Sequence, residues 1–162
     1  MLQFAVTGTT QRANVAELHR VADDDAALRA VKQRQRRGDI ALARFIDHNK
    51  VAEAVAKSGV LLSAADYRVQ GGHRTTPSEV EVHEKETDII YVADGEATYV
   101  IGGTMVGGKV TAPGQLRGTT IQGGETHQLT RGDVIVIPAG TPHQTKEVRT
   151  SVSFYIVKVL KP

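Results

Sequence analysis

Short apolar runs alternate with glycine-rich turns over the last two thirds of the chain. The runs recur about every ten residues, a spacing typical of antiparallel strands joined by turns. They are VLLSAADYRV, SEVEVH, DIIYVADG, EATYVIGG, DVIVIPAG and SVSFYIVKVL. No helical pattern separates them, whereas parallel strands of one sheet need a crossover helix. The pattern therefore predicts an antiparallel β-barrel or sandwich and argues against a βαβ sheet.

The preceding part of the chain has a different composition. Residues 14–59 are rich in alanine, arginine, aspartate and lysine, whereas glycine, valine, threonine and isoleucine dominate from residue 60 onward. The first composition is typical of helices and the second of strands. We therefore predict a helical N-terminal extension at residues 1–59 and a β-domain at residues 60–162.

Capping residues mark three helices in this extension. The first begins at Asn14, and the second follows three consecutive aspartates and ends before Gly38. The third begins at Asp39 or Asp47 and ends at Gly59. Aspartate and asparagine accept hydrogen bonds from the first free amides of a helix, and glycine readily adopts the conformation that ends one.

Charge and hydropathy argue against nucleic-acid and membrane partners. The chain carries 20 basic and 18 acidic side chains, a formal net charge of +2 at pH 7. The basic run at residues 32–37 alternates with glutamine and lacks aromatic neighbours, which favours a solvated helix face. No apolar stretch reaches the roughly 18 residues of a membrane span, and no signal peptide is visible. We expect a cytoplasmic location for the chain as given.

The absence of cysteine limits the chemistry of a metal site. Without cysteine there is neither a disulfide nor a thiolate ligand, so a metal ion must be held by histidine, aspartate or glutamate. Aromatic residues are also scarce, since the chain has no tryptophan, three phenylalanines and four tyrosines. The core must therefore consist mainly of aliphatic side chains.

One segment places polar residues on the inner face of a predicted strand. Residues two apart in a strand share a face, so Glu79, Glu81 and His83 point to the side opposite the intervening valines. Carboxylates and an imidazole on an inward face are costly unless a cation or water lies beside them. Asp88 opens the next apolar run and can return to the same place across a turn.

A second segment fixes another histidine. Residues 132–133 form a tight turn before the strand VIVI. Pro138, Gly140 and Pro142 then impose a stiff, sharp bend. His143 ends this bend, and a side chain held so rigidly is well suited to complete a metal site.

The second segment resembles a sequence motif of the cupin superfamily. That motif has the form G-x5-P-x-G-x2-H-x3-N, and Gly132, Pro138, Gly140 and His143 keep its spacing. Glu147 stands where the final asparagine is usual. The resemblance covers approximately the β-rich part of the chain and implies a cupin-type antiparallel β-barrel of jelly-roll form.

The first segment resembles the other cupin motif, G-x5-H-x-H-x3,4-E-x6-G. His83 and Gly95 match their positions in it. Glu81 replaces the first histidine, Asp88 replaces the glutamate, and Thr75 stands at the opening glycine. The first motif is therefore kept less closely than the second.

Carried over position by position, the resemblance implies a metal site. Its ligands would be Glu81, His83, Asp88 and His143. Such a nitrogen and oxygen donor set suits Fe(II), Mn(II), Zn(II), Ni(II) or Co(II), and no organic cofactor is implied. Asp88 is one methylene shorter than glutamate, so it can fall short of the metal while Glu81 supplies the carboxylate. Ordinary interior residues of a barrel without metal are the alternative.

Further residues are candidates for the wall of a substrate pocket. A core position is the alternative for the aromatic candidates, and a surface or rim position is the alternative for the histidines. The candidates are Tyr67, Arg68, His73, Tyr91, Tyr99 and His127.

We therefore expect a metalloprotein that binds a divalent metal and a small polar or anionic molecule inside the barrel. If it is an enzyme, the resemblance implies oxygenase, isomerase or decarboxylase chemistry. The alternative is a non-catalytic small-molecule-binding or sensor protein. The glycine-rich residues 102–128 distinguish these two functions, because a lid there would favour catalysis and a fixed hairpin would favour binding. The resemblance and the need to cover edge strands also predict a homodimer.

Overall fold

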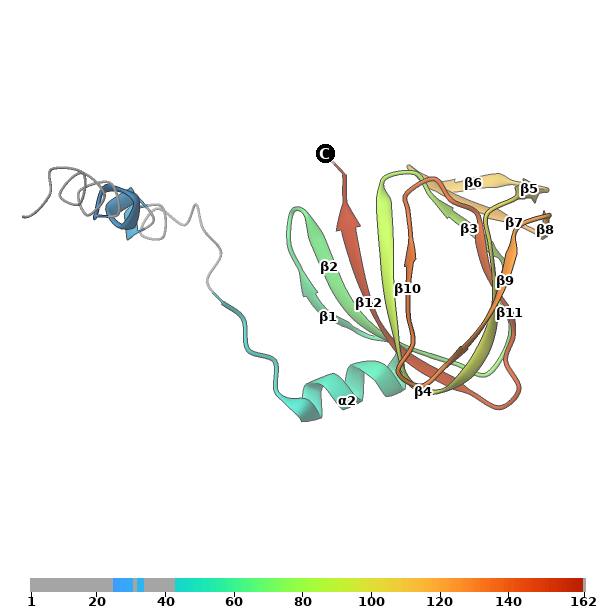
Figure 1. Cartoon of the computed structure of the whole chain (residues 1–162), viewed down its shortest axis with the longest axis horizontal. Coiled ribbons are helices and arrows are strands. Elements are labelled where there is room, and N and C mark those ends of the chain that lie inside the picture. The colour runs from blue at the N-terminus through green and yellow to red at the C-terminus, as the bar shows by residue number, and fades with distance from the viewer. Residues whose placement is uncertain (1–24, 31, 34–42, 162) are drawn as a thin grey trace, which may run out of the picture. The chain divides into compact units, whose positions relative to one another are not determined.

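The computed structural model describes residues 25–30, 32–33 and 43–161 (Figure 1). The chain divides into two compact units, Met1–Phe45 and Ile46–Pro162. Residues 25–30 and 32–33 are helical, as the sequence predicts. The helix start predicted at Asn14, the stop predicted at Gly38 and most of the basic run lie outside the described residues. The boundary placed after residue 59 stays a prediction.

One helix, α2 (His48–Lys57), belongs to the second unit. The Asp47 carboxylate caps it and accepts hydrogen bonds from two backbone amides of the first turn, at 3.0 and 3.3 Å. Ser58 ends the helix in the left-handed conformation, with φ of 55°. Of the two starts considered from the sequence, Asp47 is the one observed.

Strands make up the rest of the second unit. In chain order they are β1 (Val60–Ser63), β2 (Tyr67–Arg74), β3 (Val80–His83), β4 (Glu86–Ile101), β5 (Thr104–Val106), β6 (Lys109–Ala112), β7 (Gln115–Gly118), β8 (Thr120–Gln122), β9 (Glu125–Thr130), β10 (Val134–Ile137), β11 (His143–Glu147) and β12 (Val152–Leu160).

The long strand β4 links two antiparallel sheets that face each other as a barrel (Figure 1). Its first half pairs with β12 and β10, and β12 continues to β2 and β1. We call these strands sheet 1. Its second half pairs with β9 and β11, and β11 continues through β3 and β7 to β6. We call these strands sheet 2. The predicted mainly β, jelly-roll barrel is confirmed.

Aliphatic side chains from both sheets fill the space between them. Burial of each Val, Leu or Ile contributes about 1.5–3 kcal/mol. Phe154 lies so close to β2 that a Cβ atom on Gly72 would stand 2.1 Å from its ring. The buried cluster consists of Ile90, Val92, Ala97, Tyr99, Leu129, Ile137, Val152 and Phe154.

The glycine-rich residues 102–128 are built into the barrel. β5 and β8 form a separate two-stranded sheet, whereas β7 pairs with β3 along its whole length. His83 and Gln115 are opposite one another in that pairing. Strands β6, β7 and β9 of this segment therefore belong to sheet 2, and β7 reaches the predicted site.

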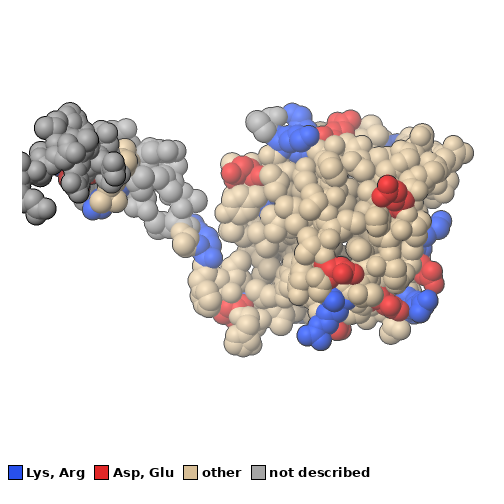
Figure 2. All heavy atoms as spheres, viewed as in Figure 1, with Lys and Arg blue, Asp and Glu red and all other residues tan. Residues whose placement is uncertain are grey.

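Charged side chains of both signs are interspersed over the barrel face shown in Figure 2. This distribution agrees with the small net charge of the chain. No helix among the described residues is long and apolar enough to cross a membrane.

Candidate metal centre

β3 and the start of β4 place three of the predicted ligands inside the barrel. Glu81 and His83 share one face of β3, and the tight connection to β4 returns Asp88 beside them. The Asp88 Oδ2 atom lies 3.5 Å from His83 Nε2. His83 and Asp88 are 5% and 3% exposed, so this is an interior cluster.

The proline-glycine bend before β11 brings in the fourth residue. Gly140, with φ of 83°, donates its backbone N–H to the His83 carbonyl at 2.8 Å. The Pro142 carbonyl accepts a hydrogen bond from the Gly102 amide at 2.8 Å. These bonds tie the bend to β3 and β4, and the His143 ring centroid lies 5.2 Å from that of His83.

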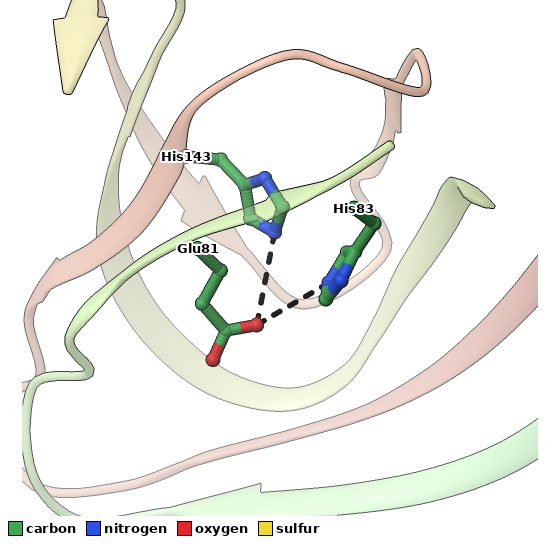
Figure 3. Close-up of side chains that lie close together, drawn as sticks. All are labelled: Glu81, His83 and His143. Atoms are coloured by element: carbon green, nitrogen blue, oxygen red, sulfur yellow. Dashed lines mark ion pairs between the residues drawn. The ribbon is translucent and has the colours of Figure 1, made fainter. Parts of the chain in front are cut away.

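Glu81, His83 and His143 converge on one point (Figure 3). The Glu81 Oε2 atom lies 3.4 Å from His83 Nε2 and 3.9 Å from His143 Nε2. One ligand atom from each residue lies within 4.8 Å of the others. A second such group joins His83 and Asp88 to Glu86.

Hydrogen bonds fix the tautomers of both histidines. His83 Nδ1 contacts the side-chain oxygen of Gln115, which can only accept, so Nδ1 carries the proton. His143 Nδ1 donates to the Thr141 carbonyl at 3.0 Å. In the neutral imidazoles both Nε2 atoms therefore direct a lone pair at the Glu81 carboxylate.

The His83 Nε2 atom is buried and has no hydrogen-bond partner in the described part of the chain. Burial lowers the pKa of His143, so that ring is uncharged at neutral pH. When both rings are neutral, two imidazole lone pairs and a carboxylate oxygen face one another inside the barrel. A bound cation would convert this repulsion into attraction.

The other Glu81 oxygen faces two arginines. Oε1 lies 3.7 Å from Nη2 of Arg74 and 3.7 Å from Nη2 of Arg117. Burial raises the pKa of Glu81, but the His83 contact and the charges of Arg117 and Arg74 outweigh it and lower the pKa to about 2. Glu81 is therefore ionised at neutral pH.

Asp88 is engaged by a buried lysine. The Lys158 ammonium group donates to both Asp88 oxygens, at 2.7 and 2.9 Å, and lies 3.1 Å from the Glu86 carboxylate. Glu86 in turn lies 3.6 Å from Arg68. Although burial raises the pKa of Glu86, the Lys158 charge and hydrogen bond lower it below its usual value.

A small cavity adjoins the cluster. It measures about 30 Å³ and is lined by Glu81, Asp88, Tyr99 and His143, among other residues. Burial raises the pKa of Tyr99, so its hydroxyl is neutral at physiological pH. Because one water needs at least about 10–15 Å³ of such volume, the cavity accommodates a water-sized molecule.

The residues predicted for the pocket wall lie in several places. Tyr99 lines the interior cavity, and Arg68 reaches the cluster through Glu86. Tyr91 is 42% exposed and stacks on Tyr155 outside the barrel. His73 binds the Ser153 hydroxyl at 2.9 Å. Tyr67 lies on β2. His127 lies on β9, where its Nε2 atom is 3.4 Å from the Glu125 carboxylate.

Several residues of the cluster were not predicted from the sequence. Lys158 follows Val152, Phe154 and Ile156 at inward positions of β12, so strand alternation could have revealed it. Glu86 lies within the first motif. No sequence signal identifies the residues on β2 and β7, because they reach the cluster only through the register of these strands, which the sequence alone does not give. The residues missed are Arg74, Glu86, Gln115, Arg117 and Lys158.

Comparisons with known proteins bear on the fold. No protein-family model and no curated protein matches the chain. Solved structures do match it. An uncharacterised conserved protein with a double-stranded β-helix domain from Klebsiella pneumoniae matches with a TM-score of 0.50 and 20% identity, over 74% of this chain and 91% of that chain. BH2720 from Bacillus halodurans matches with a TM-score of 0.51 and 13% identity, over 74% and 83%.

The double-stranded β-helix is the barrel of the cupins, and the proline-glycine bend with His143 occupies its expected place between β10 and β11. The chain has a cupin fold. Other matched structures are of longer chains. The DMSP lyase DddQ from Ruegeria pomeroyi matches with a TM-score of 0.43 and 15% identity, over 59% of this chain and 39% of that chain. The chain spans 39% to 63% of the length of three of the matched structures.

Proposed function

We propose that this cupin binds one divalent transition-metal ion through Glu81, His83 and His143, next to a small anionic ligand inside the barrel. The observation that carries the proposal is the convergence of two oriented imidazole lone pairs on one carboxylate oxygen. The unpartnered, buried His83 Nε2 atom lies at that point. Hydrogen-bonded donors on the far side of ligating histidines are typical of metal sites.

The donor set fits such an ion in spacing and chemistry. Two ligands held at about 2.1 Å from one tetrahedral ion lie about 3.4 Å apart, and the observed separations are 3.4 and 3.9 Å. Two nitrogen donors and one oxygen donor suit Fe(II), Mn(II), Zn(II), Ni(II) or Co(II). When bound, the ion would act as a Lewis acid toward an oxygen-containing ligand.

Asp88 serves in this proposal as a support for the centre. Lys158 donates to both of its oxygens, so neither is free to bind a metal without competing with an ammonium group. Asp88 Oδ2 nevertheless stands 3.5 Å from His83 Nε2 and 3.9 Å from His143 Nε2. Its charge therefore favours a cation at the centre.

The surrounding charges support an anionic ligand. Three carboxylates, Glu81, Glu86 and Asp88, are paired with Arg68, Arg74, Arg117 and Lys158. Four cationic groups against three anionic groups leave an excess of positive charge, and a divalent ion would increase it. The three arginines are partly exposed, so water solvates part of this charge, and their guanidinium groups offer donors to a small anion. With only about 30 Å³ of free interior volume, the anion is small.

Two classes of function would use this site differently. Oxygenase, isomerase or decarboxylase chemistry needs an open position on the metal for the reacting molecule. A binding or sensor role does not, and the incorporation of β7 into sheet 2 favours it, because that segment is not a separate lid.

Metal analysis tests the proposal. The full chain is purified without added metal, stripped with a chelator and reconstituted separately with Mn(II), Fe(II), Co(II), Ni(II) and Zn(II). We expect about one equivalent of at least one of these metals, as for a single structural or catalytic site. His143→Ala should lose this binding, whereas His127→Ala, which removes a histidine 40% exposed beside Glu125, should keep it. Failure of the unaltered chain to bind any of the five would overturn the proposal.

A further inference from the structure

Three polar side chains lie in a row on the outer side of sheet 1, beside helix α2. Ser153 of β12 is paired with His73 of β2 on one side and with Asp94 of β4 on the other. The next outward positions of β12 are Tyr155 and Val157, so aromatic and apolar surface adjoins the row. Neighbouring strands lie about 4.8 Å apart, which places the three polar side chains within reach of one small molecule.

Helix α2 forms one wall of a groove over this row. Its backbone approaches β2 so closely that a Cβ atom on Gly71 would lie 2.5 Å from the Val55 nitrogen. The space between the helix and the sheet, which we call the outer groove, has a volume of about 450 Å³. Small-molecule sites typically measure roughly 300–1,000 Å³. The helix lines the outer groove with apolar side chains, and the sheet lines it with the polar row and Tyr155.

A β-bulge in β4 turns Asp94 toward the outer groove. The register with β12 shifts there, because Phe154 is opposite Val92 whereas Ser153 is opposite Asp94, so Ala93 is the extra residue. Val92 points into the core, and strict alternation would send Asp94 inward as well. With the bulge, Ala93 and Asp94 both line the groove.

The polar row has hydrogen-bonding capacity that the fold does not use. His73 Nδ1 and the Ser153 hydroxyl form a hydrogen bond with each other at 2.9 Å. The ring then keeps its Nε2 atom for another partner. Asp94 is exposed, and within the described residues its carboxylate takes part in no hydrogen bond or ion pair.

The charge of the outer groove favours a cationic ligand. Asp94 is the one acidic residue among those that line it, and none of the lining residues is lysine or arginine. An ammonium group forms a charge-assisted hydrogen bond with such a carboxylate and is also attracted to the face of an aromatic ring. The ring of Tyr155 is held in place by stacking on Tyr91, with centroids 6.2 Å apart and an interplanar angle of 14°.

We propose that the outer groove binds a small primary amine with an apolar body. The ammonium group pairs with Asp94, and the body lies between Tyr155 and the apolar side chains of α2. A polar substituent on that body can bond to His73 or Ser153. This site is separate from the metal centre, because outward side chains of sheet 1 form it.

A set of three related compounds tests the charge preference. Phenethylamine is the cationic probe, phenethyl alcohol its neutral counterpart and hydrocinnamate its anionic one. In calorimetric titrations of the full chain at pH 7, we expect phenethylamine to bind about ten-fold more tightly than the other two. Asp94→Asn should remove this preference, whereas Asp66→Asn, at an exposed position between β1 and β2, should keep it. No binding of phenethylamine, equal binding of the three compounds, or equal effects of the two substitutions would overturn the proposal.

A steric substitution tests where the amine binds. Ala56 lines the outer groove from the exposed side of α2, so Ala56→Phe fills the groove without changing its charge. This variant should lose phenethylamine binding, whereas Ala112→Phe, at an exposed position on β6, should bind as the unaltered chain does. In the unaltered chain, the amide resonances of residues 93–94 and 153–155 should shift on titration with phenethylamine. Unchanged affinity in Ala56→Phe, or shifts confined to other residues, would contradict the proposal.

Discussion

Gln115 orients the ring of His83 in the proposed metal centre. Its side-chain oxygen accepts the His83 Nδ1 proton and thereby directs the Nε2 lone pair at the Glu81 carboxylate. The residue itself lies on β7, opposite His83 in register, and need not touch the metal. It is a positioning residue.

Replacement of Gln115 by alanine should weaken metal binding about 10–100-fold, the usual effect of removing a partner of a ligating histidine. Gln115→Glu keeps the acceptor and should restore much of the affinity. Gln128→Ala removes a glutamine bonded to Thr98 on the outer side of sheet 2 and should have no effect. Chelator-competition titrations of the three variants measure the affinities, and equal losses in Gln115→Ala and Gln128→Ala would rule out the positioning role.

Lys158 contributes to the free energy of unfolding, and this contribution can be measured without metal. It is 5% exposed and neutralises Asp88, which is 3% exposed. Replacing Lys158 by methionine keeps the volume but leaves a buried carboxylate unpaired, which should lower the free energy of unfolding by about 3–5 kcal/mol.

Lys57→Met is the matched control for Lys158→Met. Lys57 is paired with Glu53 on the exposed surface of α2, at 2.8 Å, where solvent screens the pair, so its loss should leave the free energy of unfolding nearly unchanged. Urea unfolding of both variants at pH 7 compares them directly. A similar loss of free energy of unfolding in the two variants would show that the buried lysine and aspartate do not act as a pair.

At the scale of elements, α2 depends on its cap. The Asp47 carboxylate satisfies two of the first free amides, and the ten-residue helix has a single buried residue, Ala54. Asp47→Ala should therefore lower the free energy of unfolding by about 1 kcal/mol, and Asp47→Ser should retain most of it. Hydrogen exchange of the α2 amides measures the local effect, and unchanged protection in Asp47→Ala would contradict the capping role.

The elements that sequence alone predicted best are those fixed by local backbone chemistry. Pro138, Gly140 and Pro142 define their own bend, so the place of His143 follows from residues adjacent to it. The alternation in β3 likewise put Glu81 and His83 on one face. By contrast, Lys158 and Gln115 reach the cluster through pairing between strands distant in sequence. That register depends on the whole barrel and cannot be read from either strand alone.

At the scale of the whole molecule, metal binding and folding should be linked. The ligands come from β3 and β11, which lie about sixty residues apart in sequence and meet only in the folded barrel. A metal that binds the folded chain alone stabilises it by about 2.7 kcal/mol at a free concentration of 100 times Kd. For a domain of this size that corresponds to roughly 5–10 °C in Tm.

Thermal melts of the stripped and reconstituted chain should show this increase, and melts of His143→Ala should not. The same melts of His127→Ala provide the control, because that variant keeps all the proposed ligands. A metal-induced increase of the same size in His143→Ala would mean that the ion binds elsewhere.

The most direct test of the centre is its coordination sphere. Crystals of the chain reconstituted with the metal that binds most tightly should give one strong anomalous peak inside the barrel, bonded to Nε2 of His83, Nε2 of His143 and an oxygen of Glu81. Lys158 should remain bound to Asp88 in the same crystal. An anomalous peak held by Asp88 and Glu86 in place of Glu81, or no peak within the barrel at full metal occupancy in solution, would contradict the account.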